Sequence, residues 1–431
     1  MIAVASLRDE VTELLQELIR VDTVNPPGNE TMAAELLRAY LEPHGVQCEL
    51  YARVPERANL VARIPGRGGP RLALLSHTDT VLANAGEWEV GTWSGELRDG
   101  EVWGRGALDM KGEVAAGAVA LASLAREGFA PSGDLIFVAA ADEEVNVDFG
   151  LSWLCREHPE AVRADYALNE GGGERITLGG RAFYLLASAE KMSAPFVLRT
   201  RGRSGHASIP HIGDNALLKA APLIEKLGAF EPEPMHIPET EAFFRVVLGK
   251  VLEPREGYRR LRELDEPLAG VIRALFGPTY APTMASASLK RNIIPAVCEV
   301  TVDSRLLPGQ TPDDSAAIVR EVLGDGEYEL EWIEAAGGTR SPLESPLSEA
   351  IESWVGEADP EAAVAPICVP GFTDSHWMRE AFGTVAYGFF PMRTMSAEVA
   401  TLLVHSANER AAVDDLELGV EFYRYAARAL L

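Results

Sequence analysis

The sequence predicts an α/β protein with a mixed, mostly parallel sheet and helices on both faces, into which a second, smaller α+β domain is inserted. Two observations support this fold class. Short apolar runs alternate with helical stretches in both end regions of the chain, which is typical of a sheet covered on both faces. In the middle, the order of elements changes to βαββαβ, as in ferredoxin-like domains. A length of 431 residues also favours about two to three domains.

The segment Met1 to Val21 predicts a helix. It contains Ser6, a residue type that caps helix starts, and its apolar residues recur at helical spacing. These residues are Val11, Leu14, Leu15, Leu18 and Ile19. A signal peptide would instead carry an unbroken apolar core behind positive charge. A second helix is expected over Thr31 to Leu41, where Met32, Leu36, Leu37 and Leu41 share one face.

Apolar runs then predict the strands of the main domain, at residues 59–64, 71–76, 134–140 and 165–169. Residues 111–126, rich in alanine, leucine and valine, predict a helix between two of these strands. The same pattern resumes after about residue 336, with a strand at 384–390 and a closing helix at 413–431. We therefore assign residues 1–190 and 336–431 to the two parts of one domain.

Residues 191–335 predict the inserted domain. Its expected elements are a strand at 195–200, a helix at 215–227, strands at 283–289 and 297–305, a helix at 312–323 and a strand at 328–333. Such a βαββαβ unit can bury one face of its own sheet against two helices. The proline- and glutamate-rich stretch 230–258 receives no assignment.

The charge balance excludes several classes of partner. The formal net charge is -26 and the pI is near 4.8, whereas nucleic acids and anionic membranes bind basic surfaces. No window approaches the apolar length of a membrane span. Expected partners are small molecules or a second copy of the chain. An anionic substrate would be repelled at long range and would need a locally cationic pocket.

The four cysteines, Cys48, Cys155, Cys298 and Cys368, are widely scattered and lack the spacing of a metal or redox motif. We interpret them as reduced thiols of a cytoplasmic protein.

Histidines and carboxylates occur where predicted strands end. His77 and Asp79 follow one apolar strand, Glu143 and Glu144 follow another, and Glu170 follows a third. In open α/β sheets the loops at the carboxyl ends of the strands converge on one crevice. Asp109, one acid of the pair Glu143-Glu144, Glu170 and His405 complete with His77 a two-histidine, three-carboxylate set, which suits two zinc ions that share one carboxylate.

At this point the sequence resembles the di-zinc exopeptidases and amidohydrolases that include aminoacylase, acetylornithine deacetylase, succinyl-diaminopimelate desuccinylase and carboxypeptidase G. The resemblance spans nearly the whole chain and rests on seven blocks in order. They are Ser76-His77-Thr78-Asp79, residues 104–112, Asp142-Glu143-Glu144, Asn169-Glu170-Gly171, residues 204–208, Asp303-Ser304-Arg305 and residues 405–409.

The resemblance implies how the metals are shared. Asp109 matches the bridging position, His77 and Glu170 would hold one zinc, and Glu144 and His405 would hold the other. Asp79 would accept a hydrogen bond from the far ring nitrogen of His77 and fix its tautomer. Cobalt or manganese could replace zinc, because histidines and carboxylates bind all three.

Of the two adjacent acids, Glu144 is assigned to metal and Glu143 to the role of general base. Neighbouring residues on an extended or turning backbone point in different directions, so one carboxylate can bind metal while the other faces the attacking water. Outside this context, such a pair is usually a solvated turn.

The resemblance also implies that His206 reaches across a homodimer, formed through the inserted domain, and donates to the tetrahedral oxyanion. The alternative is a loop histidine that caps the next helix. Asn292 would face the substrate at the same side, or else be a turn residue before Pro295. The inserted domain would then serve as both a lid and a dimerisation domain.

Arg305 resembles the arginine that grips the substrate carboxylate, a task that suits the guanidinium fork. Its alternative is a salt bridge with Asp303. Gly371 and Thr373 match a loop that touches the substrate, although Phe372 stands where a small residue is common.

The family often carries a cis peptide bond after the bridging aspartate, so we expect one between Asp109 and Met110. The glycines around Asp109, at 104, 106 and 112, lack the spacing and the lysine-serine ending of a nucleotide loop.

These features predict a metal-dependent hydrolase, a dipeptidase-like exopeptidase or an N-acyl-amino-acid deacylase, which cleaves an amide bond with a metal-activated water. Two alternatives stay open at this point. One is a catalytically silent metal- or peptide-binding protein of the same fold. The other is a dinuclear hydrolase of phosphate or ester substrates, which would need more cationic groups around the metals.

Overall fold

The computed structural model describes residues 6–146 and 148–431, which form two compact units. The first unit contains the residues up to Ser188, Ser341–Ile367 and Thr373–Leu431. The second contains Ala189–Arg340 and Cys368–Phe372.

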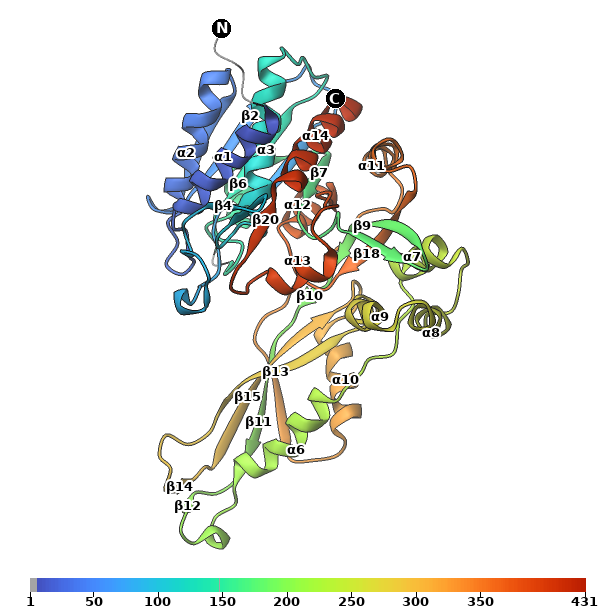
Figure 1. Cartoon of the computed structure of the whole chain (residues 1–431). Helices are drawn as coiled ribbons and strands as arrows, with labels where there is room; N and C mark the ends of the chain where they lie inside the picture. The colour runs from blue at the N-terminus through green and yellow to red at the C-terminus, as the bar shows by residue number, and fades with distance from the viewer. Residues whose placement is uncertain (1–5, 147) are drawn as a thin grey trace. The chain divides into compact units, whose positions relative to one another are not determined.

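The first unit is built on a mixed sheet with the strand order β1-β2-β6-β3-β7-β19-β9-β18, and β8 pairs with β9 (Figure 1). The bounds are β1 Gln47–Ala52, β2 Ala58–Ile64, β3 Leu72–His77, β6 Leu135–Ala140, β7 Tyr166–Asn169, β8 Arg175–Leu178, β9 Arg181–Glu190, β18 Ala362–Val369 and β19 Val385–Gly388. Strands β6, β3, β7 and β19 are parallel. Antiparallel pairs flank them, β1-β2 and β2-β6 on one side and β19-β9 on the other. The predicted mixed α/β class is confirmed.

Both faces of this sheet are covered by helices, and successive residues of the central strands alternate between the two faces. Leu72 and Leu74 of β3 join one apolar core, whereas Ala73 and Leu75 join the other. The first core contains residues of α1 (Leu7–Arg20), α2 (Thr31–Leu41), α3 (Lys111–Arg126), α11 (Pro346–Ala358) and α14 (Val413–Leu430). The second contains residues of α4 (Leu151–Glu157), α5 (Pro159–Val162) and α12 (Ser375–Phe382). Because both faces of the central strands are buried, their sequences are continuous apolar runs instead of alternating apolar and polar residues.

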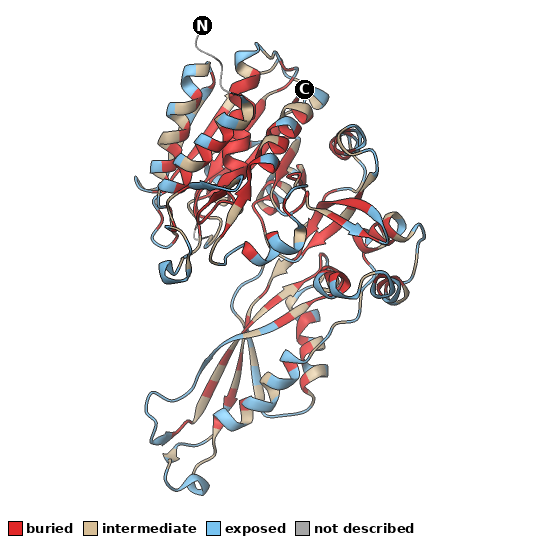
Figure 2. Cartoon of the chain, in the orientation of Figure 1, coloured by how far each residue is buried: buried red, intermediate tan, exposed pale blue. Residues whose placement is uncertain are grey.

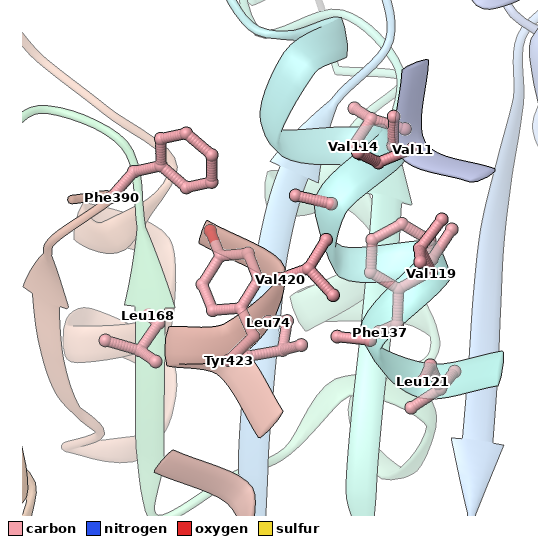
Figure 3. Close-up of a cluster of buried hydrophobic side chains, with 14 of the residues drawn as sticks. Val11, Leu74, Val114, Val119, Leu121, Phe137, Leu168, Phe390, Val420 and Tyr423 are labelled. Carbon is pink, nitrogen blue, oxygen red and sulfur yellow. The ribbon is translucent and has the colours of Figure 1, made fainter. Parts of the chain in front are cut away.

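Helix α3 is buried from Lys111 to Leu124, and it packs between the sheet, α1 and α14 (Figures 2 and 3). Its side chains Val114 and Val119 lie in the same cluster as Phe137 of β6 (Figure 3). A helix this deeply buried is apolar all round, in agreement with its predicted span of residues 111–126.

Helix α1 starts where the sequence predicts. The Ser6 side chain accepts a hydrogen bond from the Asp9 amide, with the oxygen and nitrogen 3.1 Å apart. Its buried face contains the five apolar residues named above. Smaller elements of this unit are β4 Glu96–Arg98, β5 Glu101–Trp103, β20 Arg410–Ala412 and α13 Ala397–Leu403.

The second unit has a sheet of order β16-β11-β15-β10-β17, with β13 paired to β15. Its elements are β10 Met192–Ser193, β11 Phe196–Arg201, α6 Ala216–Gly228, β13 Thr279–Ser286, β15 Val297–Leu306, α10 Pro312–Leu323, β16 Tyr328–Trp332 and β17 Ala336–Gly337. The order β11, α6, β13, β15, α10, β16 is βαββαβ. Alternate residues of β15 are buried, and they pack with residues of α6 and α10.

Two details of this unit differ from the sequence-based expectation. Strand β13 covers Thr279–Ser286 rather than residues 283–289, and its pairing is irregular between Pro282 and Met284. Proline lacks an amide donor and is tolerated at such an irregularity. The unassigned stretch contains α7 Pro238–Leu248 and leads into α8 Pro254–Leu264 and α9 Glu266–Ile272.

None of the helices within residues 6–146 and 148–431 has the length and apolar character needed to cross a bilayer.

Candidate metal centre

Three neighbouring parallel strands place the candidate ligands at one edge of the first unit's sheet. His77 is the last residue of β3. Glu143 and Glu144 follow the end of β6 after a short turn, and Glu170 follows β7 directly. Because these strands run side by side in the order β6, β3, β7, their carboxyl ends bring the side chains together.

Asp109 lies between the two histidines. Its Oδ1 is 3.1 Å from Nε2 of His77, and its Oδ2 is 2.9 Å from Nε2 of His405. Each histidine thus faces a different oxygen of one carboxylate. The peptide bond between Asp109 and Met110 is cis, as predicted.

Each histidine also has a second carboxylate beside it. Oε2 of Glu170 is 3.8 Å from Nε2 of His77, and Oε2 of Glu144 is 3.3 Å from Nε2 of His405. Zinc bonds of 2.0–2.2 Å in a tetrahedron put neighbouring ligand atoms about 3.4 Å apart. The side chains present therefore fit two ions, with His77 and Glu170 beside one oxygen of Asp109 and His405 and Glu144 beside the other.

Candidate ligand atoms of His77, Asp109 and Glu144 lie within 4.8 Å of one another, and so do those of His77, Glu143 and Glu170. Glu143 is therefore next to the same cluster, close to the Glu170 side of His77.

Asp79 is fully buried and organises the turn that carries the two acids. Its Oδ1 accepts the Glu143 amide at 3.1 Å, and its Oδ2 accepts the Glu144 amide at 3.2 Å. Nδ1 of His77 is 3.1 Å from the backbone oxygen of Asp79 and 3.4 Å from Oδ1. The ring nitrogen therefore faces both the carbonyl and the carboxylate of Asp79.

The cluster concentrates negative charge in a partly buried site, where the side chains of Asp109 and Glu170 are 16% and 18% exposed. Burial and the charge of Glu170 raise the pKa of Glu143 well above its usual range, and burial raises the pKa values of Glu144 and Glu170. Hydrogen bonds to Asp109 and Glu144 raise the pKa of His405 to about 10. Excess carboxylate charge held in a buried site favours cations.

Glu409 holds the loop that carries Asp109. Its Oε2 accepts hydrogen bonds from Arg105 at 2.6 Å and from the Gly106 amide at 3.0 Å. Its Oε1 accepts the amides of Leu108 at 2.8 Å and Asp109 at 3.1 Å. Both side chains of the Arg105–Glu409 pair are almost completely buried. Since Glu409 follows His405 by four residues, it ties the His405 loop to the Asp109 loop.

Several residues of the centre were not singled out from the sequence. Asn25 donates to Oδ2 of Asp79 at 2.9 Å and to Asp142 at 3.1 Å. Asp374 is buried, and burial raises its pKa well above the usual range while nearby His77 opposes this. The only sequence signal for Asn25 is its position before two prolines, and Asp374 belongs to the recognised loop 371–374 without an assigned role.

In the second unit, His206 lies on one strand of a two-stranded ribbon, and Asn292 lies in the turn just before the other strand. His206 belongs to β12 (Gly205–His206) and pairs with Ile293 of β14 (Ile293–Ile294). The Ala207 amide donates to the Asn292 carbonyl at 3.1 Å, and Oγ of Ser208 is 2.7 Å from Nδ1 of His206.

Arg305 contacts Asp303 through two hydrogen bonds, from Nε at 3.0 Å and from Nη2 at 3.1 Å. This is the salt bridge that the sequence left open as an alternative. Gly371 is in the segment 368–372 of the second unit, and Thr373 in the first unit accepts the Ser375 amide at 3.2 Å. Substrate contacts of these residues stay predictions.

Comparison with known proteins gives one family. The model described as peptidase family M20/M25/M40 matches residues 73–429. The succinyl-diaminopimelate desuccinylase of Bordetella avium is 27% identical over 430 residues, covering 98% of each chain. The N-fatty-acyl-amino acid synthase/hydrolase PM20D1 of Xenopus tropicalis is 27% identical over 368 residues, covering 81% of this chain and 70% of that protein.

Solved structures share the fold at lower identity. The M20 family metallo-carboxypeptidase Sso-CP2 of Sulfolobus solfataricus superimposes with a TM-score of 0.73 at 18% identity, covering 98% of this chain and 99% of that one. Human carnosine dipeptidase 1 gives a TM-score of 0.71 at 13% identity, covering 98% and 96%.

Proposed function

This chain belongs to peptidase family M20/M25/M40, and on that premise we propose that it is a metal-dependent hydrolase that cleaves the amide bond of an N-acyl amino acid or short peptide. Its relatives are named for hydrolysis of fatty-acyl amino acids and for removal of succinyl groups. Both activities break an amide bond.

One observation carries the proposal: the two oxygens of Asp109 face two different histidines, and each histidine has its own second carboxylate. We assign His77 and Glu170 to one metal ion, His405 and Glu144 to the other, and Asp109 to both. Zinc is the proposed metal, with Co²⁺ or Mn²⁺ as substitutes. When bound, the ions supply Lewis acidity, which lowers the pKa of water and polarises the amide carbonyl.

Glu143 is the proposed general base. Its carboxylate lies within 4.8 Å of the candidate ligand atoms of His77 and Glu170. Its carboxylate would accept a proton from the attacking water and pass it to the leaving nitrogen, which needs a group of raised pKa within hydrogen-bond reach. Asp79 supports this role, because it fixes the Glu143 amide.

The substrate-binding roles are proposals of the same kind. Arg305 would hold the substrate carboxylate, exchanging its partner Asp303 for the ligand. His206 and Asn292 would donate to the oxyanion and the substrate, a role that is supported by the hydrogen bond from the Ala207 amide to the Asn292 carbonyl, which holds the two segments together. Gly371 and Thr373 would contact the substrate through the loop that they border.

A homodimer through the second unit is proposed because this unit exposes large apolar side chains. Met284 is 69% exposed, Leu289 102%, Leu218 70% and Ile209 54%. These side chains would be covered in such a dimer. We also propose a cytoplasmic location, which the four free cysteines support.

The decisive experiment replaces the proposed base. Glu143→Gln should lower kcat on N-acyl amino acids by a factor of about 10² to 10⁴, with metal content unchanged at about two ions per chain. The matched control is Glu160→Gln, whose side chain is 76% exposed, and it should retain activity. Near-normal turnover of Glu143→Gln would refute the assignment.

The same assay separates the remaining alternatives. A metal-loaded protein that binds acyl amino acids without turnover would be a silent member of the family, and turnover of phosphate esters alone would make it a different hydrolase. Either result would refute the proposed function.

A further inference from the structure

A cavity of about 310 Å³ opens beside the proposed metal ligands Asp109 and Glu170 in the first unit. Its remaining wall comes from residues 107–108, the start of α3, the segments after β7 and β19, helix α13 with Val404, β20 and the start of α14. This wall is largely apolar, and the side chains that matter below are Leu108, Phe390, Met392, Met395, Ala400 and Val404.

The apolar part of the wall is a defined cluster. Met395, Ala400 and Leu403 are buried together, and Leu108 and Met392 pack against them. Methionine side chains are flexible and fill irregular space, so a wall with two of them adapts to ligands of different lengths. Ligand pockets of proteins typically start at about this volume.

The place of the cavity beside the proposed metal ligands puts it within reach of one substituent of the reacting amide. An amide that reacts at the cluster of Asp109 and Glu170 has substituents on both its carbonyl and nitrogen sides, and the cavity lies directly against those two carboxylates. On the basis of the proposed function, we propose that this cavity binds an unbranched aliphatic chain of the substrate, carried by the acyl group or by the amino acid.

The charged residues at the cavity argue against a second carboxylate there. Among the described lining residues the charged side chains are all acids, Asp109, Glu113, Glu170, Glu174 and Asp415. The Asp415 carboxylate accepts hydrogen bonds from the backbone amides of residues 393–395, and the Tyr423 hydroxyl donates to Glu113 at 3.3 Å. A dicarboxylic acyl group such as succinyl would find no cationic side chain among the described lining residues to pair with its second carboxylate, whereas a hydrocarbon chain would contact the apolar wall.

The test uses the full, metal-loaded chain and two substrate series. One is N-acylglycines from acetyl to decanoyl, with succinylglycine added; the other is N-acetyl amino acids with straight side chains of increasing length. In one series kcat/KM should rise about fourfold for each added methylene until the cavity is full. The series that rises identifies which part of the substrate carries the chain. Succinylglycine should be slower than butanoylglycine.

Variants of α13 tie the effect to the cavity. Ala400 is 5% exposed and lines the cavity, whereas Leu402 on the same helix is 73% exposed and does not. Ala400→Phe should lower the ratio of long-chain to acetyl kcat/KM at least tenfold, and Leu402→Phe should leave this ratio unchanged. Met395→Ala enlarges the cavity and should move the optimum to longer chains, which keeps the test available if Ala400→Phe does not fold.

Binding provides a readout that does not depend on turnover. Calorimetry should show that decanoate binds the metal-loaded protein at least tenfold more tightly than acetate, and that Ala400→Phe removes the difference. Loss of all hydrolysis together with chain-dependent binding would overturn only the proposed function. Flat chain-length profiles in both series, equal effects of Ala400→Phe and Leu402→Phe, or faster cleavage of succinylglycine would overturn the cavity assignment.

Discussion

At the scale of single residues, Glu409 shows how a side chain outside the ligand set shapes the centre. Its carboxylate accepts four hydrogen bonds, one from the Arg105 side chain and three from backbone amides. Glu409→Gln turns an amide NH₂ toward some of these donors and leaves buried Arg105 without a compensating charge. Breaking a buried pair in this way costs about 3–5 kcal/mol of unfolding free energy.

The measurement combines urea unfolding with metal competition. Glu409→Gln should unfold at lower urea and lose zinc to a chelator more readily than the wild type, because the loop that carries Asp109 is no longer fixed. Glu101→Gln, which breaks the partly exposed pair of Glu101 with Arg410, is the matched control and should change stability by less than about 1 kcal/mol. Equal zinc affinity in Glu409→Gln and the wild type would show that Glu409 does not position the ligand loop.

Lys191 makes a prediction about pH dependence. Its side chain is fully buried in the second unit, where Nζ donates to the Gly277 carbonyl at 2.6 Å. Burial lowers its pKa to about 8, against an ordinary value of 10.5. The unfolded chain therefore binds more protons than the folded one between these values. The contribution of Lys191 to the free energy of unfolding should rise with pH across that window, by up to about 1.4 kcal/mol per pH unit.

Comparing variants isolates this effect from other titrating groups. The difference in unfolding free energy between the wild type and Lys191→Met should shift in favour of the wild type from pH 8 to pH 10. Lys250→Met, at an exposed position, should show no such shift. A pH-independent difference for Lys191→Met would mean that Lys191 stays protonated in the fold.

The candidate ligands could be singled out from the sequence because each follows an apolar strand or lies in a recognisable block. The support around them could not. Glu409 is about 300 residues from the amides that it accepts, and Asn25 contacts Asp79 and Asp142 across long stretches of chain. Hydrogen bonds of this kind leave no local periodicity in the sequence.

At the scale of elements, α3 depends on close packing against β6. A Cβ on Gly117 would lie 2.8 Å from Cε2 of Phe137, whose side chain is 1% exposed. The ring has little space into which it can move, so the clash should outweigh the better helix propensity of alanine. We expect Gly117→Ala to lower the unfolding free energy by about 1–2 kcal/mol.

Gly356 supplies the matched control for this substitution. It lies within α11 of the same unit, and a Cβ there would meet no atom within 4 Å. Gly356→Ala should raise the unfolding free energy by about 0.5–1 kcal/mol, measured by the same urea titration. If both variants were stabilised, the contact between α3 and Phe137 would be looser than the structure describes.

Elements with strong periodicity could be predicted well, as the spans of α2 and α3 show. The bounds of elements were predicted less well where tertiary contacts determine where the element begins and ends. Strand β13 starts four residues earlier than expected, because its pairing with β15 continues through the irregularity at Pro282. Helices α7 and α8 lie in or next to a stretch rich in proline and glutamate, where prolines begin both helices instead of breaking them.

At the scale of the whole molecule, the segment Cys368–Phe372 shows a limit of sequence-based reasoning. The contact pattern assigns these five residues to the second unit, although the chain on both sides belongs to the first. A segment of five residues is too short to show a distinct composition or periodicity in the sequence. The loop block 371–374 is recognisable in the sequence, but its division between two units depends on contacts far along the chain.

The net charge of -26 yields a prediction for the proposed substrates, which are anions through their free carboxylate. Charge of one sign repels such a substrate at long range, whereas the Arg305 guanidinium attracts it only at short range. The screening length falls from about 30 Å at 0.01 M salt to about 8 Å at 0.15 M, so added salt removes the long-range repulsion first.

We expect KM for an N-acyl amino acid to fall two- to fivefold over this range, by analogy with charge-steered association. The corresponding amino-acid amide, which lacks the carboxylate, should show a nearly constant KM. If KM for the acid rises with salt instead, the attraction of Arg305 and of the proposed metal ions would outweigh the field of the whole chain.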